Sequence, residues 1–226
     1  MSFRIFLLSP ATAHGPKAST LVEDPPRTPA ARRLQTPGGM TLGALFTHLS
    51  GLYFTGKLAY ARQFANPPST LAARGVHVVT FTHGLLDPDT AVDLDMLRRF
   101  RAAGATEFDT VSRVALEASA RSLAEVLGEV RCDVVLLGSV HSTKYTEILE
   151  PIFGERLRVP RDLVRRGHLQ RGGLLLECVE ARRELDYIAL DDVRAMLADA
   201  RPSARRRGLE SSAPAARDAA APRETP

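Results

Sequence analysis

Residues 132–138 read CDVVLLG, an almost continuous apolar run that ends at a glycine. Such runs are typical of strands buried on both faces of a parallel sheet, because helices cover both faces. Beyond Gly138 the sequence SVHSTKYTEILEPIFG predicts a turn and a short helix, with Ser142 or Thr143 as its N-cap. This strand, turn and helix favour an α/β fold for the chain around them.

The segments on either side alternate between strand-like and helical patterns. Further strands are predicted at 4–8, 75–81, 156–160, 174–180 and 185–190. Helical periodicity is found at 40–64, 91–104, 110–130 and 191–200. The first of these reads as two helices separated near Thr55-Gly56, since glycine ends helices readily. The alternation predicts a three-layer α/β single domain with a mainly parallel central sheet.

Two segments do not fit this alternation. Residues 9–39 are rich in Pro, Gly and Thr, and we interpret them as a long irregular loop within a domain that spans residues 1–200. Residues 201–226 are rich in Arg, Ala and Pro and contain few large apolar side chains. We expect them to form a disordered tail.

The composition, 44% apolar and 25% charged, is typical of a globular protein. No apolar run approaches the roughly 20 residues that a membrane span needs, so no membrane partner is expected. The apolar stretch at 5–8 is shorter than the roughly 7–15 residues of a signal-peptide core. We therefore expect a cytoplasmic protein in which Cys132 and Cys178 are buried free thiols.

Positive charge is distributed unevenly along the chain. Residues 201–226 contain six Arg, two Glu and one Asp, and so supply +3 of the net charge of +4. Residues 156–183 hold eight Arg against one Asp and two Glu. A local basic face of this kind favours an anionic partner, and we expect nucleic acid or a nucleotide.

Candidate ligand contacts follow the strand at 132–138. In open α/β sheets, ligands bind beyond the carboxyl ends of the strands, where helix N-termini offer unpaired amides to anions. Gly138 would allow close backbone approach, Ser139 could donate its hydroxyl, and Lys144 could add positive charge. The alternative is an ordinary strand end followed by a helix cap, without a ligand.

The segment FTHGLLDPD, residues 81–89, also follows a strand. His83 has a reference pKa near neutrality, which suits a general acid or base, and Asp87 could orient it. The alternative is a plain turn in which Gly84 adopts a positive φ.

The segment RRGHLQRGG, residues 165–173, is unusual in combining three Arg, one His and three Gly. We interpret it as a mobile loop over phosphate or carboxylate, which arginine binds in a bidentate manner. The contacts would come from Arg166, His168, Arg171 and Gly172. A solvated charged loop is the alternative.

The segment YFTGKLAYAR, residues 53–62, joins the two helices predicted at 40–64. It would place Thr55, Gly56 and Lys57 at a helix N-terminus, which is favourable for anions. The aromatic residues around them are interpreted as core. The chain lacks a P-loop, a Gly-x-Ser-x-Gly elbow and a His-Glu-x-x-His motif, and neither a metal site nor a cofactor is predicted.

Four segments together resemble a group of bacterial proteins: GLYFTGKLAYARQF, HGLLDPD, VVLLGSVHSTKYTEIL and RGGLLL. That group is similar to the YaaA-type peroxide-stress proteins and to the middle domain of archaeosine synthase, which in turn resemble the uracil-DNA glycosylase fold. The resemblance covers roughly residues 4 to 190 and implies a sheet whose strand ends face nucleic acid. It implies that one cleft is lined by Thr55, Gly56, His83, Gly84, Asp87, Gly138 and Tyr145.

The sequence departs from this group after the first strand. The relatives often end that strand in Cys-Ser with a nearby lysine, whereas LLSPATAHGPK keeps Ser9 and Lys17 without the cysteine. No glycosylase-type catalytic carboxylate follows either. The resemblance therefore does not extend to base excision.

Three functional hypotheses follow. The preferred one is a nucleic-acid-associated protein that binds phosphate and a nucleotide or base in a strand-end cleft, with DNA or RNA maintenance or stress response as its setting. The alternative is an enzyme on a small anionic metabolite, such as a nucleotide or ribosyl compound. The third is a non-catalytic protein that contacts partners through residues 201–226. The sequence leaves open whether the protein is an enzyme and what its oligomeric state is.

Overall fold

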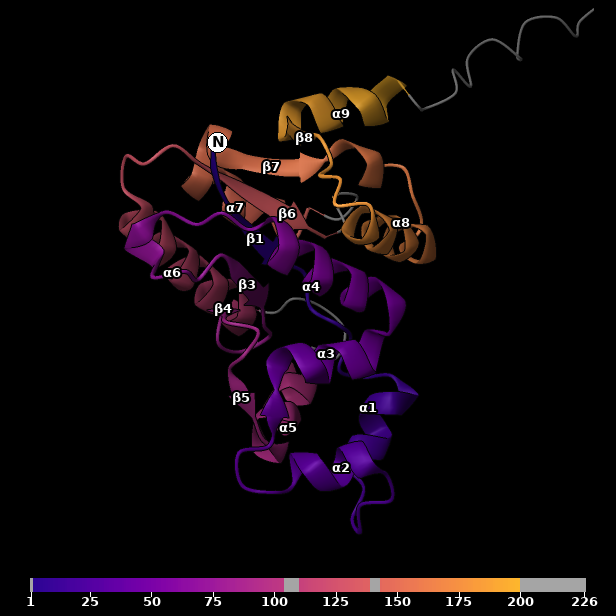
Figure 1. Cartoon of the computed structure of the whole chain (residues 1–226). Coiled ribbons are helices and arrows are strands. Elements are labelled where there is room, and N and C mark those ends of the chain that lie inside the picture. The colour runs from indigo at the N-terminus through magenta and orange to yellow at the C-terminus, as the bar shows by residue number, and fades with distance from the viewer. Residues whose placement is uncertain (1, 104–109, 139–142, 200–226) are drawn as a thin grey trace, which may run out of the picture.

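The computed structural model describes residues 2–103, 110–138 and 143–199, which fold around a six-stranded sheet (Figure 1). The strand order is β4-β3-β1-β6-β7-β8. The bounds are β1 Phe3–Leu8, β3 Val76–Val79, β4 Leu85–Leu86, β6 Cys132–Leu137, β7 Leu157–Pro160 and β8 Tyr187–Ala189. Strands β3, β1, β6 and β7 are parallel, and the edge strands β4 and β8 are antiparallel to their neighbours. The predicted mainly parallel sheet is confirmed.

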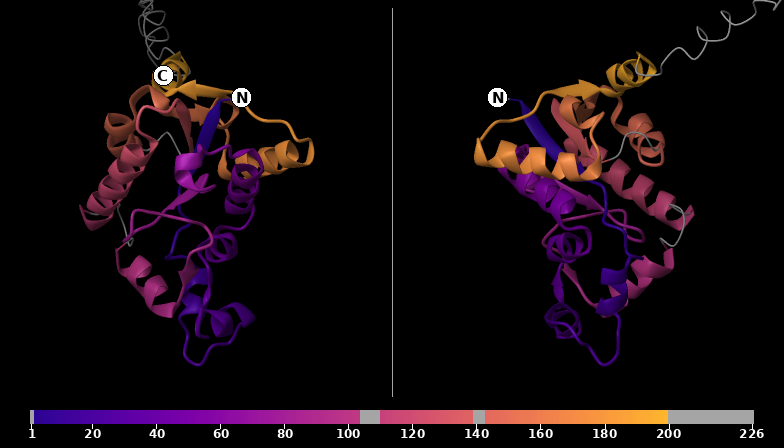
Figure 2. Two further views of the ribbon diagram at one scale, coloured as in Figure 1. Left: turned by 60° about the vertical axis from the view of Figure 1, so that its left-hand side comes forward. Right: turned by 90° about the vertical axis from the view of Figure 1, so that its right-hand side faces the viewer.

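Helices cover both faces of this sheet. Their bounds are α1 Pro16–Leu21, α2 Pro29–Leu34, α3 Leu42–Ser50, α4 Leu52–Phe64, α5 Leu94–Ala103, α6 Thr110–Leu127, α7 Thr146–Phe153, α8 His168–Glu180 and α9 Leu190–Asp199. Alternate residues of β1 point to opposite faces, so Phe6 and Leu8 pack toward α4 and α8 while Ile5 and Leu7 pack toward α6 and α7. Figure 2 shows these two helical layers on either side of the sheet. The three-layer prediction is confirmed.

Beyond the end of β1 the chain enters a group of helices formed by α1, α2, α3 and α5, at the bottom of Figure 1. A two-stranded sheet of β2, Met40–Thr41, and β5, Ala91–Val92, joins this group. The predicted irregular loop at 9–39 was therefore wrong in part, since it contains α1 and α2. Their prolines occupy first-turn positions, where a missing amide costs no hydrogen bond, and Thr28 caps α2 by accepting from the Ala31 amide at 3.1 Å.

The largest correction concerns residues 165–180. The sequence predicted a charged loop over 165–173 and a strand over 174–180, but α8 begins at His168 and continues to Glu180. Leu175 and Cys178 face the core, three residues apart, as in a helix. The apolar run Leu-Leu-Leu fits both a buried strand and a buried helix, and its environment decides in favour of the helix.

Helices α4 and α8 pack closely because glycines lie where they meet. A Cβ atom on Gly56 would lie 2.7 Å from the carbonyl oxygen of Gly172. A Cβ atom on Gly172 would lie 2.9 Å from the carbonyl oxygen of Leu52 and 3.0 Å from the Cα of Tyr53. Glycine is less favourable than alanine inside a helix, so its presence here reflects this backbone contact.

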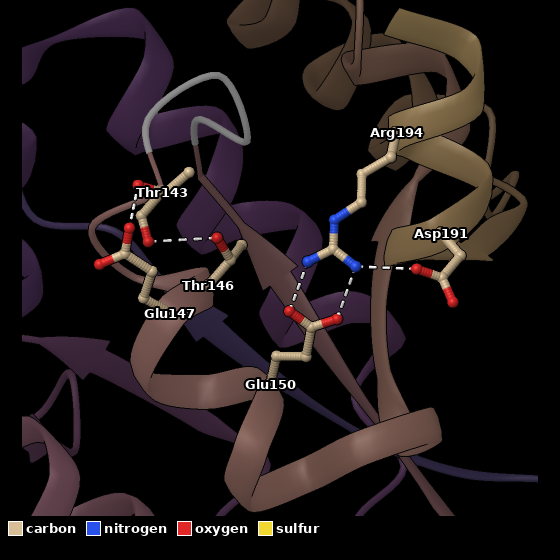
Figure 3. Close-up of polar contacts among 6 residues, drawn as sticks. All are labelled: Thr143, Thr146, Glu147, Glu150, Asp191 and Arg194. Atoms are coloured by element: carbon tan, nitrogen blue, oxygen red, sulfur yellow. Dashed lines mark hydrogen bonds and ion pairs between the residues drawn. The ribbon is translucent and has the colours of Figure 1, made fainter. Parts of the chain in front are cut away.

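The outer helices α7 and α9 are joined by an ion pair. Arg194 donates to both carboxylate oxygens of Glu150, at 2.8 and 2.5 Å, and also to Asp191 at 2.8 Å (Figure 3).

Cys132 and Cys178 are buried and form no disulfide, as predicted. Within the described residues, none of the helices has the length and apolar character to cross a membrane.

The glycine contact predicts opposite effects at two neighbouring positions. Gly172→Ala should destabilise the protein by about 1–3 kcal/mol, because the new methyl group would meet the α4 backbone. Gly173→Ala is the matched control, since a Cβ atom there meets nothing within 4 Å and alanine favours the helix by up to ~1 kcal/mol. Urea denaturation of both variants measures the difference. Equal stability of the two variants would contradict this account of the helix packing.

Candidate functional site

The candidate site lies where the two central parallel strands end. Ser9 directly follows β1, and its amide donates to the Leu137 carbonyl at 3.1 Å. Gly138 directly follows β6, and a Cβ atom there would lie 3.1 Å from the Cβ and 3.3 Å from the Oγ of Ser9. A larger residue at 138 would press on the Ser9 side chain. The two strand ends therefore lie side by side. In parallel α/β sheets, ligands ordinarily bind at this carboxyl end of the strands.

Lys57 reaches this point from the inner face of α4. Its side chain is only 2% exposed, and its Nζ donates to the Ser9 carbonyl at 2.5 Å and to Ser9 Oγ at 2.9 Å. The rings of Tyr53 and Phe54, one turn earlier on α4, have their centroids 4.7 and 5.0 Å from the Nζ atom. The cation is thus held between a strand end and two aromatic side chains, and not in solvent.

Arg171 approaches the same point from α8. It is 3% exposed, and its Nε donates to the Leu163 carbonyl at 2.9 Å, which fixes the guanidinium in place. The close packing of Gly56 against Gly172 brings α8 near Lys57, so the charge of Arg171 acts on both Lys57 and Tyr53. We call Ser9, Tyr53, Lys57 and Arg171 the basic cluster.

Burial, and to a smaller extent the positive charge of Arg171, together lower the pKa of Lys57 to about 7. Burial raises the pKa of Tyr53, and Arg171 opposes part of that rise. The Tyr53 hydroxyl is buried, and no acceptor for its proton lies within the described residues. The cluster is therefore a place where positive charge is costly and a buried donor is unsatisfied.

No ion pair to Lys57 or Arg171 occurs within residues 2–103, 110–138 and 143–199. Buried cations are ordinarily paired with carboxylates, because an uncompensated charge in a protein interior is expensive. Two neighbouring cations without such a partner are suited to a bound anion. This is the feature of the cluster that points to function.

Five predicted contact residues meet here: Gly56, Lys57, Gly138, Arg171 and Gly172. Lys57 and Arg171 supply charge, while the three glycines permit the close approach of α4, α8 and the strand ends. His168 lies at the edge of the cluster. It is exposed, and its ring packs edge-on against Tyr53 with 5.2 Å between centroids.

The predicted helix N-terminus at Thr55-Gly56 was wrong. Helix α4 begins at Leu52, after Gly51 with its φ of +67°. The Thr55 amide and hydroxyl both donate to the Gly51 carbonyl, at 3.0 and 2.9 Å. Lys57 therefore acts through its side chain, and the backbone amides of this segment are not free for an anion.

Lys144 and Tyr145 lie apart from the basic cluster. Tyr145 is 3% exposed and packs in the core on the α6 and α7 side of the sheet, and Lys144 Nζ lies 4.9 Å from the Tyr145 ring centroid.

The prediction that Thr143 caps α7 was also wrong. The Thr143 hydroxyl donates to the Glu147 carboxylate at 2.5 Å (Figure 3). Ser139 and Ser142 fall outside the described residues.

His83 and Asp87 do not form the predicted pair. The hairpin of β3 and β4 turns at Gly84, whose φ is +65°, and pairs Val78 with Leu86. Asp87 is thereby carried back along β3 toward His77, whose pKa is lowered by burial, with the charge of Asp87 opposing part of that effect. The His83 ring stays at the turn, exposed, with its Nδ1 2.7 Å from Thr82 Oγ1. In the described chain no hydrogen bond or ring contact joins His83 to the basic cluster.

The Arg-rich stretch at 156–183 does not form a single loop. Arg156 and Arg158 line a hollow with Arg131 at the other end of the sheet, near the start of β6. Arg166 is exposed, and its Nε donates to the Asp162 carbonyl at 3.0 Å. Arg171 alone among these arginines is buried. The local basic face predicted for this stretch is divided among separate parts of the surface, because the stretch spans a strand, a turn and a helix.

Sequence reasoning missed Tyr53 as a member of the site, and it noted Ser9 only as a residue shared with the resembling group. A signal for Lys57 was present in the helical periodicity, since Lys57 shares a face of α4 with the buried Phe54, Tyr60 and Ala61. A lysine on an otherwise buried face requires a partner inside the protein. Ser9 could not be identified as that partner, because 48 residues separate the two.

Comparison with protein-family models, with curated proteins and with solved structures gives no match for this chain.

The pKa of Lys57 predicts a specific pH dependence of stability. Between pH 7 and about 10.5 the unfolded chain binds the Lys57 proton and the folded chain does not, so Lys57 makes folding more favourable as the pH rises. From pH 7 to 9 the free energy of unfolding should rise on the order of 2 kcal/mol more in the wild type than in Lys57→Met. Lys17→Met, at an exposed lysine, should follow the wild type. Urea denaturation along the pH series tests this, and parallel curves for Lys57→Met and wild type would refute it.

Proposed function

We propose that the basic cluster binds the phosphate, or another anionic group, of a small ligand such as a nucleotide. The observation that carries this proposal is the burial of Lys57 and Arg171 side by side without a carboxylate in the described chain. An anion between them would offset the repulsion by Arg171, which adds to the effect of burial in lowering the pKa of Lys57. It would also give the Tyr53 hydroxyl an acceptor.

The donor types match a phosphate. Arg171 is held by its Nε, so the terminal Nη groups form the edge that can contact two oxygens of one anion. Lys57 contributes a point charge and the Ser9 hydroxyl a further polar contact. The carboxyl ends of parallel strands are the ordinary place for such ligands in sheets of this kind.

Burial favours one anionic group over a long polyanion. Cations that are only 2% and 3% exposed suit a single anionic group, because a groove that follows a nucleic-acid backbone needs a row of exposed cations. Nucleic acid remains the second candidate, because Arg161, Arg165 and Arg166 are exposed next to Leu163, which anchors Arg171. In that case the cluster would receive one phosphate and the outer arginines its neighbours.

Calorimetric titration with sulfate and with a nucleoside monophosphate tests the binding site. Arg171→Met should weaken binding by about 10- to 100-fold, the loss expected for a charge-assisted hydrogen bond. Arg166→Met, at an exposed arginine, should change the affinity for sulfate less than about twofold. Sulfate affinity should fall as the pH rises above 7, because sulfate keeps its charge while Lys57 loses its proton.

The same titration separates the two candidate ligands. A small-ligand site binds the nucleotide more tightly than single-stranded DNA or RNA of equal nucleotide concentration and is insensitive to Arg166→Met. Polymer binding that falls steeply with salt and depends on Arg166 would favour nucleic acid. The absence of any binding by sulfate, nucleotide or polymer would refute the proposal.

A further inference from the structure

We propose that Ser9 and Lys57 form a serine–lysine catalytic dyad that cleaves esters of anionic substrates, with Ser9 Oγ as the nucleophile and Lys57 Nζ as its general base. The dyad itself stands on geometry that is independent of ligand binding. The choice of an anionic substrate rests on the proposed function of the basic cluster.

The two side chains meet the geometric requirement for an activated nucleophile. Ser9 Oγ and Lys57 Nζ are 2.9 Å apart, within the roughly 2.6–3.2 Å over which a base can take a proton from a hydroxyl. A third group orients the base, since Nζ also donates to the Ser9 carbonyl at 2.5 Å. The Tyr53 and Phe54 rings limit the remaining freedom of the lysine side chain.

The surroundings of Lys57 keep its amine able to accept a proton. From α8 it faces the guanidinium of Arg171, from its own helix the rings of Tyr53 and Phe54, and from the end of β1 the Ser9 carbonyl and hydroxyl. None of these groups is a carboxylate that would hold the ammonium form. With a pKa of about 7, Lys57 is substantially neutral at pH 7 to 8, unlike an ordinary lysine.

Ser9 occupies the position from which a nucleophile can reach a ligand. It is the first residue after the central strand β1, and its neighbour across the sheet is Gly138, which has no side chain to cover it. Ser9 is 8% exposed, compared with 2% for Lys57, so the nucleophile is the more accessible of the two. A role for Lys57 solely in anchoring the strand end is the competing explanation.

The reaction proceeds in two balanced steps. Ser9 Oγ attacks the ester carbonyl carbon while its proton passes to the neutral Lys57 amine, and the C–O bond to the alcohol breaks as the alkoxide takes that proton from Lys57. Water then attacks the acyl-serine, gives a proton to Lys57, and releases the carboxylic acid and the free Ser9 hydroxyl, to which Lys57 returns the proton. Arg171 stays charged throughout and holds the anionic group of the substrate.

Covalent labelling tests the dyad directly. The full chain is incubated with an alkyl fluorophosphonate, which forms a phosphonate ester on activated serines and releases fluoride, and the adduct is located by peptide mass spectrometry. We expect one adduct, on Ser9, and none on the exposed Ser19. Ser9→Ala should abolish it, and Lys57→Met should slow it by about 100-fold or more, the usual contribution of a general base. Lys17→Met is the matched control and should label at the wild-type rate.

The wild-type protein supplies a second measurement that does not depend on how the variants fold. Because the neutral amine is the active form, the labelling rate should rise with pH and reach half its maximum near pH 7, the pKa of Lys57. Hydrolysis of p-nitrophenyl acetate should follow the same profile. A lysine that only anchors the strand end would leave Ser9 unlabelled at every pH. That result, or equal labelling of wild type and a folded Lys57→Met, would overturn the dyad.

Sulfate titration of the same samples separates this inference from the proposed function. Sulfate binding without labelling of Ser9 would overturn the dyad and leave the anion site standing. Labelling of Ser9 without sulfate binding would establish the dyad, refute the anion site, and remove the argument for an anionic substrate.

Discussion

The contact between α4 and α8 at Gly56 and Gly172 is the constraint on which the candidate site depends. These helices share a face of the sheet and meet with backbone against backbone, because neither position carries a side chain. Lys57 directly follows Gly56, and Arg171 directly precedes Gly172. Both side chains are thereby buried in the interior close to the helix contact. A wider separation of the helices would admit water between the two cations and weaken their mutual repulsion.

Enclosing two cations has an energetic cost that shapes the rest of the site. The low polarity of the interior, together with the nearby positive charge of Arg171, disfavours the charged form of Lys57. The site therefore holds one permanent charge and one amine that can gain or lose a proton near neutrality. An anion would favour the protonated amine, and a hydroxyl that must lose its proton would use the neutral one. The Ser9 hydroxyl and carbonyl stabilise both forms by giving the nitrogen polar neighbours.

Much of the sheet could be predicted because its strands carry their own pattern. The runs at 4–8, 75–81 and 132–138 are apolar or β-branched, and each forms a parallel strand close to the predicted bounds. The segment at 165–180 was misread because Gly172 and Gly173 suggested a loop and three consecutive leucines suggested a strand. The glycines are tolerated within α8, and Gly172 there serves the packing against α4. The periodicity of a short apolar run does not reveal such an environment.

The sequence by itself determined the α/β class and the parallel strands at 4–8, 75–81 and 132–138, and it supplied the basic residues, since these follow from periodicity and composition. Only the tertiary structure decided which of those residues meet. Ser9, Lys57 and Arg171 come from three distant segments, and their encounter depends on the parallel pairing of β1 with β6 and on the approach of two helices. His83 and Asp87, close in sequence, were separated by an antiparallel hairpin. Sequence distance carries no information about either outcome, because packing of the whole chain sets both.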